Sequence, residues 1–337
     1  MKKLHWFIFS LLLFATLFSP LTSFAAPLQQ DQSKTTKEIH EKIELPKLDK
    51  QKAAILEERY TKEKQHLKPV QQLNVKASKQ LKKSQNKHDS TSSQGKFIKS
   101  KNSPIPKTSA TVISDSVKAT TTDNRVKITD TTVNPYNAMA QIDFRDAQGN
   151  WYICSGTFLD KTTVLTAAHC VYDNYNHEFF TYWNVYPGEN GTNLPYGSAS
   201  STNVYAPTGW VNSNAPGDGL VTLNDVQYDY AVIKVNSNHT PNLQVSTASN
   251  IGDAITTHGY PGDKGIGGYY YLYKSTGAIN NVIDNAIVHS TTVTGGMSGG
   301  PILKSGSIIS VNSTSSWGAK LGATHLGLIN AWKAQPY

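Results

Sequence analysis

Residues 295–301 read Gly-Gly-Met-Ser-Gly-Gly-Pro, residues 166–170 read Thr-Ala-Ala-His-Cys, and residues 228–233 read Tyr-Asp-Tyr-Ala-Val-Ile. A serine hydroxyl is a poor nucleophile at neutral pH. It needs an imidazole as base and a carboxylate that orients the imidazole. The three stretches therefore predict a catalytic triad of His169, Asp229 and Ser298.

The glycines that flank Ser298 have a separate reason to be there. They let the backbone turn sharply, so that the N–H groups of Gly296 and Ser298 can point at one spot. Such an oxyanion hole stabilises a transition state by about 3–4 kcal/mol per donor. The order His, Asp, Ser along the chain matches the chymotrypsin order and neither of the other two common orders.

From about Val126 onward, Trp, Tyr, Gly and β-branched residues become common and Lys becomes sparse. Short strand-like runs alternate with turn residues, which predicts an all-β sandwich or barrel with a short helix near residues 328–333. The expected strands are Ala138–Phe144, Trp151–Phe158, Thr163–Thr166, Phe180–Tyr186, Asp229–Val235, Ala254–Gly259, Gly268–Lys274, Ala286–Ser290, Pro301–Lys304 and Ser307–Val311.

The formal charge of +8 is unevenly distributed over the 337 residues. Residues 26–124 carry 20 basic and 11 acidic residues, whereas residues 125–337 carry 10 basic and 13 acidic residues. The expected folded region is thus mildly acidic and lacks the basic footprint of a nucleic-acid-binding domain.

Residues 1–25 have the pattern of a secretory signal peptide: Lys2 and Lys3, an apolar run from Trp6 to Phe18, and small residues before a cleavage site. The apolar run is shorter than the roughly 20 residues of a membrane-spanning helix. We therefore expect a secreted, extracellular protein of the Gram-positive export type, with no stable membrane anchor.

Residues 26–124 are rich in Lys, Gln, Ser and Thr, with a weakly helical pattern over residues 38–83. Such a segment buries too little apolar surface to fold alone. We interpret it as a largely disordered propeptide, with the mature N-terminus somewhere within residues 111–126. The alternative is a retained tail that binds anionic cell-wall polymers.

The chain has two cysteines, Cys154 and Cys170. In an exported protein an even number favours a disulfide, which here would contribute on the order of 3 kcal/mol by chain entropy. Two free thiols are the alternative.

Residues from about 125 to the C-terminus resemble the bacterial glutamyl endopeptidase branch of chymotrypsin-like serine proteases. Besides the stretches quoted above, the resemblance rests on Cys-Ser-Gly-Thr at 154–157, Val-Tyr-Pro-Gly at 185–188 and Gly-Tyr-Pro-Gly-Asp-Lys at 259–264. It implies two packed six-stranded antiparallel β-barrels, at about residues 126–245 and 246–337, with the active site in the cleft between them. Asp225 is a rival for the triad carboxylate, but Asp229 begins the apolar strand that matches the family.

The expected specificity pocket departs from the family. We assign it to Thr292, Val293, Ser310 and Asn312. Asn312 stands where the resemblance predicts a histidine, and Val293 replaces a threonine, which weakens the case for cleavage after Glu. His289 or His325 could substitute for that histidine, and the pocket residues themselves indicate a small or neutral polar pocket.

Met297 precedes Ser298 where trypsin relatives have an Asp that pairs with the new N-terminus. Activation must therefore work differently, and we hypothesise that the propeptide occludes or misorders the cleft.

We expect a monomeric serine endopeptidase that acts on proteins or peptides without a cofactor. The ten histidines include no HExxH pair, so no metal site is expected. One alternative is a non-catalytic member of the same fold that binds a surface or a host protein. Another is a cell-wall-binding protein that acts through the Lys-rich segment.

Overall fold

The computed structural model describes residues 40–64, 90–92, 123–213 and 219–337. The expected signal peptide lies outside these residues, as does most of the expected propeptide. Within the described part of the chain, no helix is both long and apolar enough to cross a membrane.

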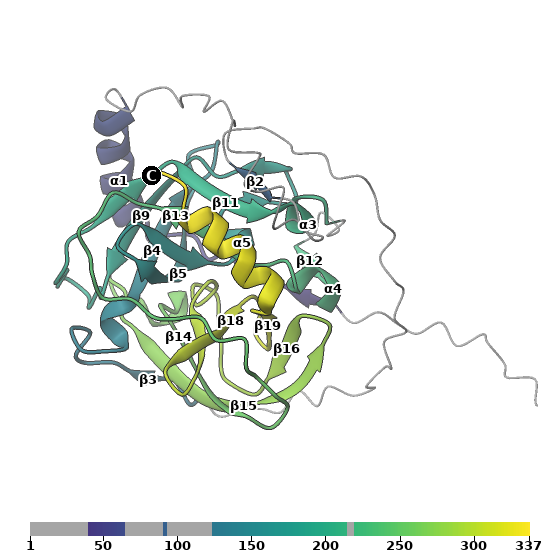
Figure 1. The fold of residues 1–337 in the computed structure, drawn as a ribbon. Helices are drawn as coiled ribbons and strands as arrows, with labels where there is room; N and C mark the ends of the chain where they lie inside the picture. Colours follow the sequence, from purple (N-terminus) through teal and green to yellow (C-terminus); the bar gives the residue numbers. More distant parts are fainter. Residues whose placement is uncertain (1–39, 65–89, 93–122, 214–218) are drawn as a thin grey trace, which may run out of the picture. The chain divides into compact units, whose positions relative to one another are not determined.

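The first of two large antiparallel sheets has eight strands in the order β10-β9-β4-β5-β6-β13-β11-β2. Its strands β4, β5, β9, β11 and β13 are labelled in Figure 1. The bounds of the eight strands are β2 Ser90–Ser92, β4 Met139–Arg145, β5 Trp151–Asp160, β6 Thr163–Thr166, β9 Tyr182–Pro187, β10 Ala199–Ser201, β11 Asn203–Pro207 and β13 Ala231–Lys234. Among the described residues, no strand ladder joins the two ends of this sheet. The sheet has two more strands than the six expected. Because its end strands do not pair with each other, it is an open half-barrel.

The second sheet has the order β14-β17-β18-β19-β16-β15-β3, and β14 also pairs with β15. That extra pairing closes six strands into a barrel, as the family resemblance implied, and leaves β3 outside. The bounds are β3 Val126–Lys127, β14 Ala254–Gly259, β15 Tyr273–Ile283, β16 Ala286–His289, β17 Pro301–Lys304, β18 Ser307–Asn312 and β19 Trp317–Lys320.

Small ladders, helices and single turns make up the remaining elements of the described residues. Two small ladders pair β1 Glu41–Lys42 with β12 Leu220–Val221, and β7 Tyr172–Asp173 with β8 Glu178–Phe179. The helices are α1 Lys50–Lys64, α3 Thr208–Val211, α4 Leu223–Val226 and α5 Ala323–Lys333, with single 3₁₀ turns η1 Tyr136–Ala138, η2 Ala168–Cys170 and η3 Gly262–Lys264.

The predicted C-terminal helix is α5, and the ammonium of Lys234 in β13 donates to the carbonyl of Lys333 at its end, at 2.9 Å. Helix α1 and β1 lie within the segment that we expected to be largely disordered. They pack on the rest of the described residues rather than folding alone: Leu56 of α1, and Leu48 just before it, are buried in the main core.

The core of the first sheet explains its stability. Phe144, Phe158 and Trp183 are fully buried, and the rings of Phe144 and Phe180 meet edge to face at 4.6 Å. Burying each such side chain contributes about 1.5–3 kcal/mol, and each aromatic pair adds about 0.5–1.5 kcal/mol. This core packs together the strands that flank His169 and Asp229.

Candidate active site

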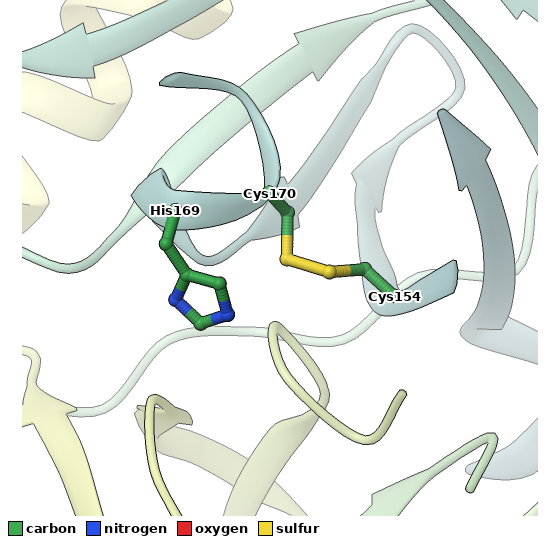
Figure 2. Close-up of side chains that lie close together, drawn as sticks. All are labelled: Cys154, His169 and Cys170. Carbon is green, nitrogen blue, oxygen red and sulfur yellow. A yellow bond between two sulfur atoms is a disulfide. The ribbon is translucent and has the colours of Figure 1, made fainter. Parts of the chain in front are cut away.

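His169 lies on η2, directly after β6. The next residue, Cys170, forms a disulfide with Cys154 in β5, and Figure 2 shows the His169 imidazole projecting beside that bridge. The indole N–H of Trp183 donates to the carbonyl of Cys170 at 2.9 Å. The bridge and the indole together fix the turn that carries the imidazole.

Asp229 precedes β13 and receives three hydrogen bonds. Its Oδ1 accepts from the backbone N–H of His169 at 2.9 Å, and its Oδ2 contacts His169 Nδ1 at 2.7 Å. Oδ2 also accepts from the hydroxyl of Ser313 at 2.5 Å. A carboxylate on Nδ1 favours the tautomer that leaves Nε2 as the basic nitrogen.

Asp225, the rival carboxylate, has a different partner. It accepts from the backbone N–H and the hydroxyl of Thr222, at 2.9 and 2.8 Å, and so forms the capping box of α4. The geometry therefore favours Asp229 as the partner of His169.

Ser155 connects the loop that carries Ser298 to the first sheet, a role that the sequence reasoning missed. Its N–H donates to the carbonyl of Ser298 at 2.7 Å, and its hydroxyl donates to the carbonyl of Gly296 at 2.7 Å. The same hydroxyl accepts from the N–H of Tyr260 at 2.8 Å. Ser155 belongs to the Cys-Ser-Gly-Thr motif at residues 154–157, but the motif alone does not indicate which groups its serine contacts.

Two glycines in this loop are required by its geometry. Gly296 has φ +94°, and a β-carbon there would lie 2.5 Å from the carbonyl oxygen of Tyr260. Gly299 has φ +80°, and its β-carbon would lie 2.3 Å from the carbonyl oxygen of Ser155. Both positions are closed to other residues by backbone conformation and by steric overlap.

The loop leaves selected polar groups without partners. Among the described residues, the N–H groups of Gly296 and Ser298 donate no hydrogen bond, and the buried Nε2 of His169 has none either. The structure thus joins His169 to Asp229 but does not form a hydrogen bond between His169 and Ser298. Catalytic hydrogen bonds are often long until substrate binds.

The expected pocket residues lie on β18 and on the segment before Ser298. Ser310 and Asn312 are fully buried, and the amide of Asn312 donates weakly to the carbonyls of His258 and Met297, at 3.5 and 3.4 Å. The N–H of Thr292 donates to the hydroxyl of Ser275 at 2.8 Å. The hydrogen-bond partners of the Asn312 amide are thus neutral carbonyl groups.

The two substitute histidines, His289 and His325, each have polar partners of their own. His325 Nε2 contacts the carbonyl of Gln227 at 3.0 Å, and its ring packs on Tyr230. His289 Nδ1 contacts the Thr291 hydroxyl at 2.9 Å, and burial lowers the pKa of His289 to about 4. His258, whose carbonyl accepts from Asn312, has its pKa lowered to about 3, also by burial. His258 and His289 are therefore neutral at physiological pH.

Ligand atoms of Cys154, His169 and Cys170 all lie within 4.8 Å of one another, which is close enough to hold a metal ion. The two sulfurs are joined in the disulfide of Figure 2, however. Zinc and similar ions bind thiolates, so this group does not fit a metal.

The two sheets and the loops between them have the fold of chymotrypsin-like serine proteases. A trypsin-like peptidase domain matches residues 154–309. The solved structure of a Glu endopeptidase in complex with MPD superposes with a TM-score of 0.56 at 31% identity, covering 64% of this chain and 99% of that chain.

A glutamyl endopeptidase of Bacillus licheniformis is 32% identical over 190 residues, which are 55% of this chain and 54% of that protein. An extracellular metalloprotease of Bacillus subtilis is 30% identical over 190 residues, or 54% of this chain and 56% of that protein. The chain spans about half the length of these curated relatives. The chain belongs to the glutamyl endopeptidase-like family of chymotrypsin-fold serine proteases.

Proposed function

We propose that this chain is a secreted serine endopeptidase that hydrolyses peptide bonds through an acyl-enzyme on Ser298. The observation that carries the proposal is the buried His169–Asp229 pair, held by three hydrogen bonds and leaving Nε2 without a partner among the described residues. An imidazole oriented in this way is the general base that a serine nucleophile needs.

In the proposed reaction, the Ser298 hydroxyl attacks the peptide carbonyl carbon while His169 Nε2 takes its proton. Asp229 stabilises the resulting imidazolium, and the N–H groups of Gly296 and Ser298 hold the oxyanion. The C–N bond then breaks, and His169 gives its proton to the leaving amine. Water, activated by the same imidazole, hydrolyses the ester and releases Ser298.

This chain differs from the family in the residues expected to bind the side chain before the scissile bond. One relative is named for glutamyl specificity, yet here the residue at the expected histidine position is the neutral Asn312, in contact with backbone carbonyls. We propose that Asn312, with Thr292, Val293 and Ser310, accepts a small or neutral polar side chain at least as readily as glutamate, because a buried carboxylate without a cation carries a desolvation penalty.

A cleavage-site map tests the function. Secreted, processed protein and its Ser298→Ala variant digest the same denatured protein mixture, and mass spectrometry identifies the new termini. Cleavage by the wild type alone supports the proposal, and the residues before the cuts give the preference. If correctly processed wild-type protein does not cut, the chain acts instead as a non-catalytic binding member of the fold.

A further inference from the structure

Residues 41–48 of the N-terminal segment lie beside the proposed catalytic groups. At one end, β1 pairs with β12, and the N–H of Ile43 donates to the carbonyl of Gly219 at 3.0 Å. At the other end, the carbonyl of Pro46 accepts from the N–H of Ile153 at 3.2 Å. Ile153 directly precedes Cys154, whose disulfide partner follows His169. Backbone hydrogen bonds thus hold the segment on both sides of the site.

The middle of the segment passes the loop of Ser298. A β-carbon placed on Gly295 would lie 3.2 Å from Cβ of Glu44 and 3.1 Å from Cδ of Pro46. Gly295 immediately precedes Gly296, one of the two proposed oxyanion donors. Residues 44–46 therefore lie against the backbone next to the proposed oxyanion hole, where a substrate has to bind.

The carboxylate of Glu41 is held by two hydroxyls. Its Oε2 accepts from Thr314 and its Oε1 accepts from Ser316. Thr314 follows Ser313, whose hydroxyl donates to the proposed triad carboxylate Asp229. Hydrogen bonds to an ionised acceptor are about twice as strong as bonds between neutral groups. These two hydroxyls form a place suited to an acidic side chain.

Helix α1 anchors the segment on the first sheet. The guanidinium of Arg145 donates two bonds of 2.8 Å to the carboxylate of Glu57, and the indole N–H of Trp151 adds one of 2.9 Å. The hydrogen bond from Arg145 lowers the pKa of Glu57. Because helix and strand belong to one chain, this anchor raises the effective concentration of the strand at the site.

We infer that residues 41–48 are an inhibitory strand that lies along the path of the substrate, with Glu41 in an acid-accepting subsite formed by Thr314 and Ser316. The inference rests on the proposed function. It also accounts for the strand's survival beside Ser298: the N–H groups of Gly296 and Ser298 donate no hydrogen bond to any described residue, so no carbonyl of the strand is in position for attack. The same two hydroxyls would then favour substrates with an acidic residue upstream of the scissile bond.

The first test uses a biotinylated alkyl fluorophosphonate, which reacts with an activated serine. Full-length and processed protein differ in mass, so one gel reports the labelling of both forms after short exposures. We expect the full-length form to label at least about tenfold more slowly, because only the fraction with the strand displaced can react. Equal rates for the two forms overturn the inference and leave the proposed function standing. Failure of the processed form to label or to cleave defeats the proposed function itself.

A charge reversal tests the subsite within the full-length chain. Glu41→Lys removes the two hydroxyl contacts, and we expect the full-length variant to label at a rate close to that of the processed protein. Glu58→Lys is the matched control, since Glu58 lies on the same segment and pairs with Lys62 along its own helix. If both variants, or neither, accelerate labelling, the assignment of Glu41 is wrong.

A cross-link tests the position of the strand independently of catalysis. Glu44→Cys with Gly295→Cys in a Ser298→Ala background places two β-carbons 3.2 Å apart, a few tenths of an ångström inside the usual separation of about 3.8 Å for a disulfide. We expect the linked peptide in a non-reducing digest. Glu58→Cys with Gly295→Cys is the control that should give none. Absence of the link between positions 44 and 295, with the native disulfide intact, overturns the inference.

Discussion

Replacing Asp229 with asparagine is the sharpest test of the proposed triad. The side chain keeps its shape, but an amide nitrogen cannot accept a hydrogen bond, whereas Asp229 accepts from His169 at both oxygens and from Ser313 at Oδ2. If the amide nitrogen faces Nδ1, the imidazole must take the other tautomer and Nε2 is no longer a base. Carboxylate-to-amide changes of this kind lower kcat by about 10⁴-fold, which corresponds to roughly 5 kcal/mol of transition-state stabilisation.

The assay is kcat and KM of processed protein on a peptide that the cleavage map identifies, over a range of pH. The loss should fall on kcat, with KM nearly unchanged, because Asp229 contacts His169 and not the substrate. Asp225→Asn is the matched control: Asp225 is the N3 residue of the α4 capping box, whose N-cap is Thr222, so that change should cost about 1 kcal/mol of stability and little activity. Full activity of the Asp229 variant, or an equal loss in the Asp225 variant, would refute this assignment.

Four further results are expected. Ser313→Ala should lower kcat/KM by about 10–100-fold with folding intact, because a hydrogen bond to a charged group contributes about 1.5–3 kcal/mol; a thermal melt checks the folding. Replacing Cys154 and Cys170 with serine should cost about 3 kcal/mol, or roughly 6–12 °C of melting temperature. Burial lowers the pKa of His258 to about 3 and of His289 to about 4, so their contribution to stability is complete above the unfolded pKa of about 6.5 and declines as pH falls toward those values, by up to about 1.4 kcal/mol per pH unit for each ring. Urea unfolding at several pH values should show this dependence of the free energy of unfolding on pH. His289→Gln should lower the number of protons taken up on unfolding by about one. EDTA should leave the activity of processed protein intact while a fluorophosphonate abolishes it, since the sulfurs beside His169 are locked in a disulfide; loss of activity on chelation would point to a metal role.

Much of the fold could be predicted from short-range pattern. The strand expected at residues 163–166 coincides with β6, and those expected at residues 254–259 and 301–304 coincide with β14 and β17. The run 268–274 was wrong, because β15 begins only at Tyr273 and continues to Ile283. Aromatic enrichment suggested a strand there, yet a positive φ at Gly267 and Gly268 breaks the extended backbone. Strand β10, which is only three residues long, offers too little periodicity to be seen.

The residue types of the candidate site could be proposed from the sequence, but their contacts could not. The order His, Asp, Ser named the groups, but nothing local in the sequence says that Ser313 reaches Asp229 across 84 positions or that Ser155 reaches Gly296 across 141. Such partners come from tertiary packing, for which one chain offers no periodic signal. The family resemblance already favoured Asp229 over Asp225, but the capping box that holds Asp225 depends on side-chain direction rather than on spacing.

The N-terminal segment links inhibition to the stability of the domain that it covers. Lys52 of α1 forms ion pairs with Asp143 at 3.2 Å and with Glu189 at 3.6 Å, and both carboxylates are almost completely buried. Burial raises the pKa of Glu189 to about 8 even with this cation beside it. At neutral pH Glu189 is therefore largely protonated, and Asp143 is the carboxylate whose charge Lys52 compensates. Removing one partner of a buried ion pair typically costs about 3–5 kcal/mol, so release of the segment leaves Asp143 either to take up a proton or to admit water. Lys52 of the bound segment therefore compensates a buried charge of the protease domain, which opposes dissociation of the segment before the chain is cut.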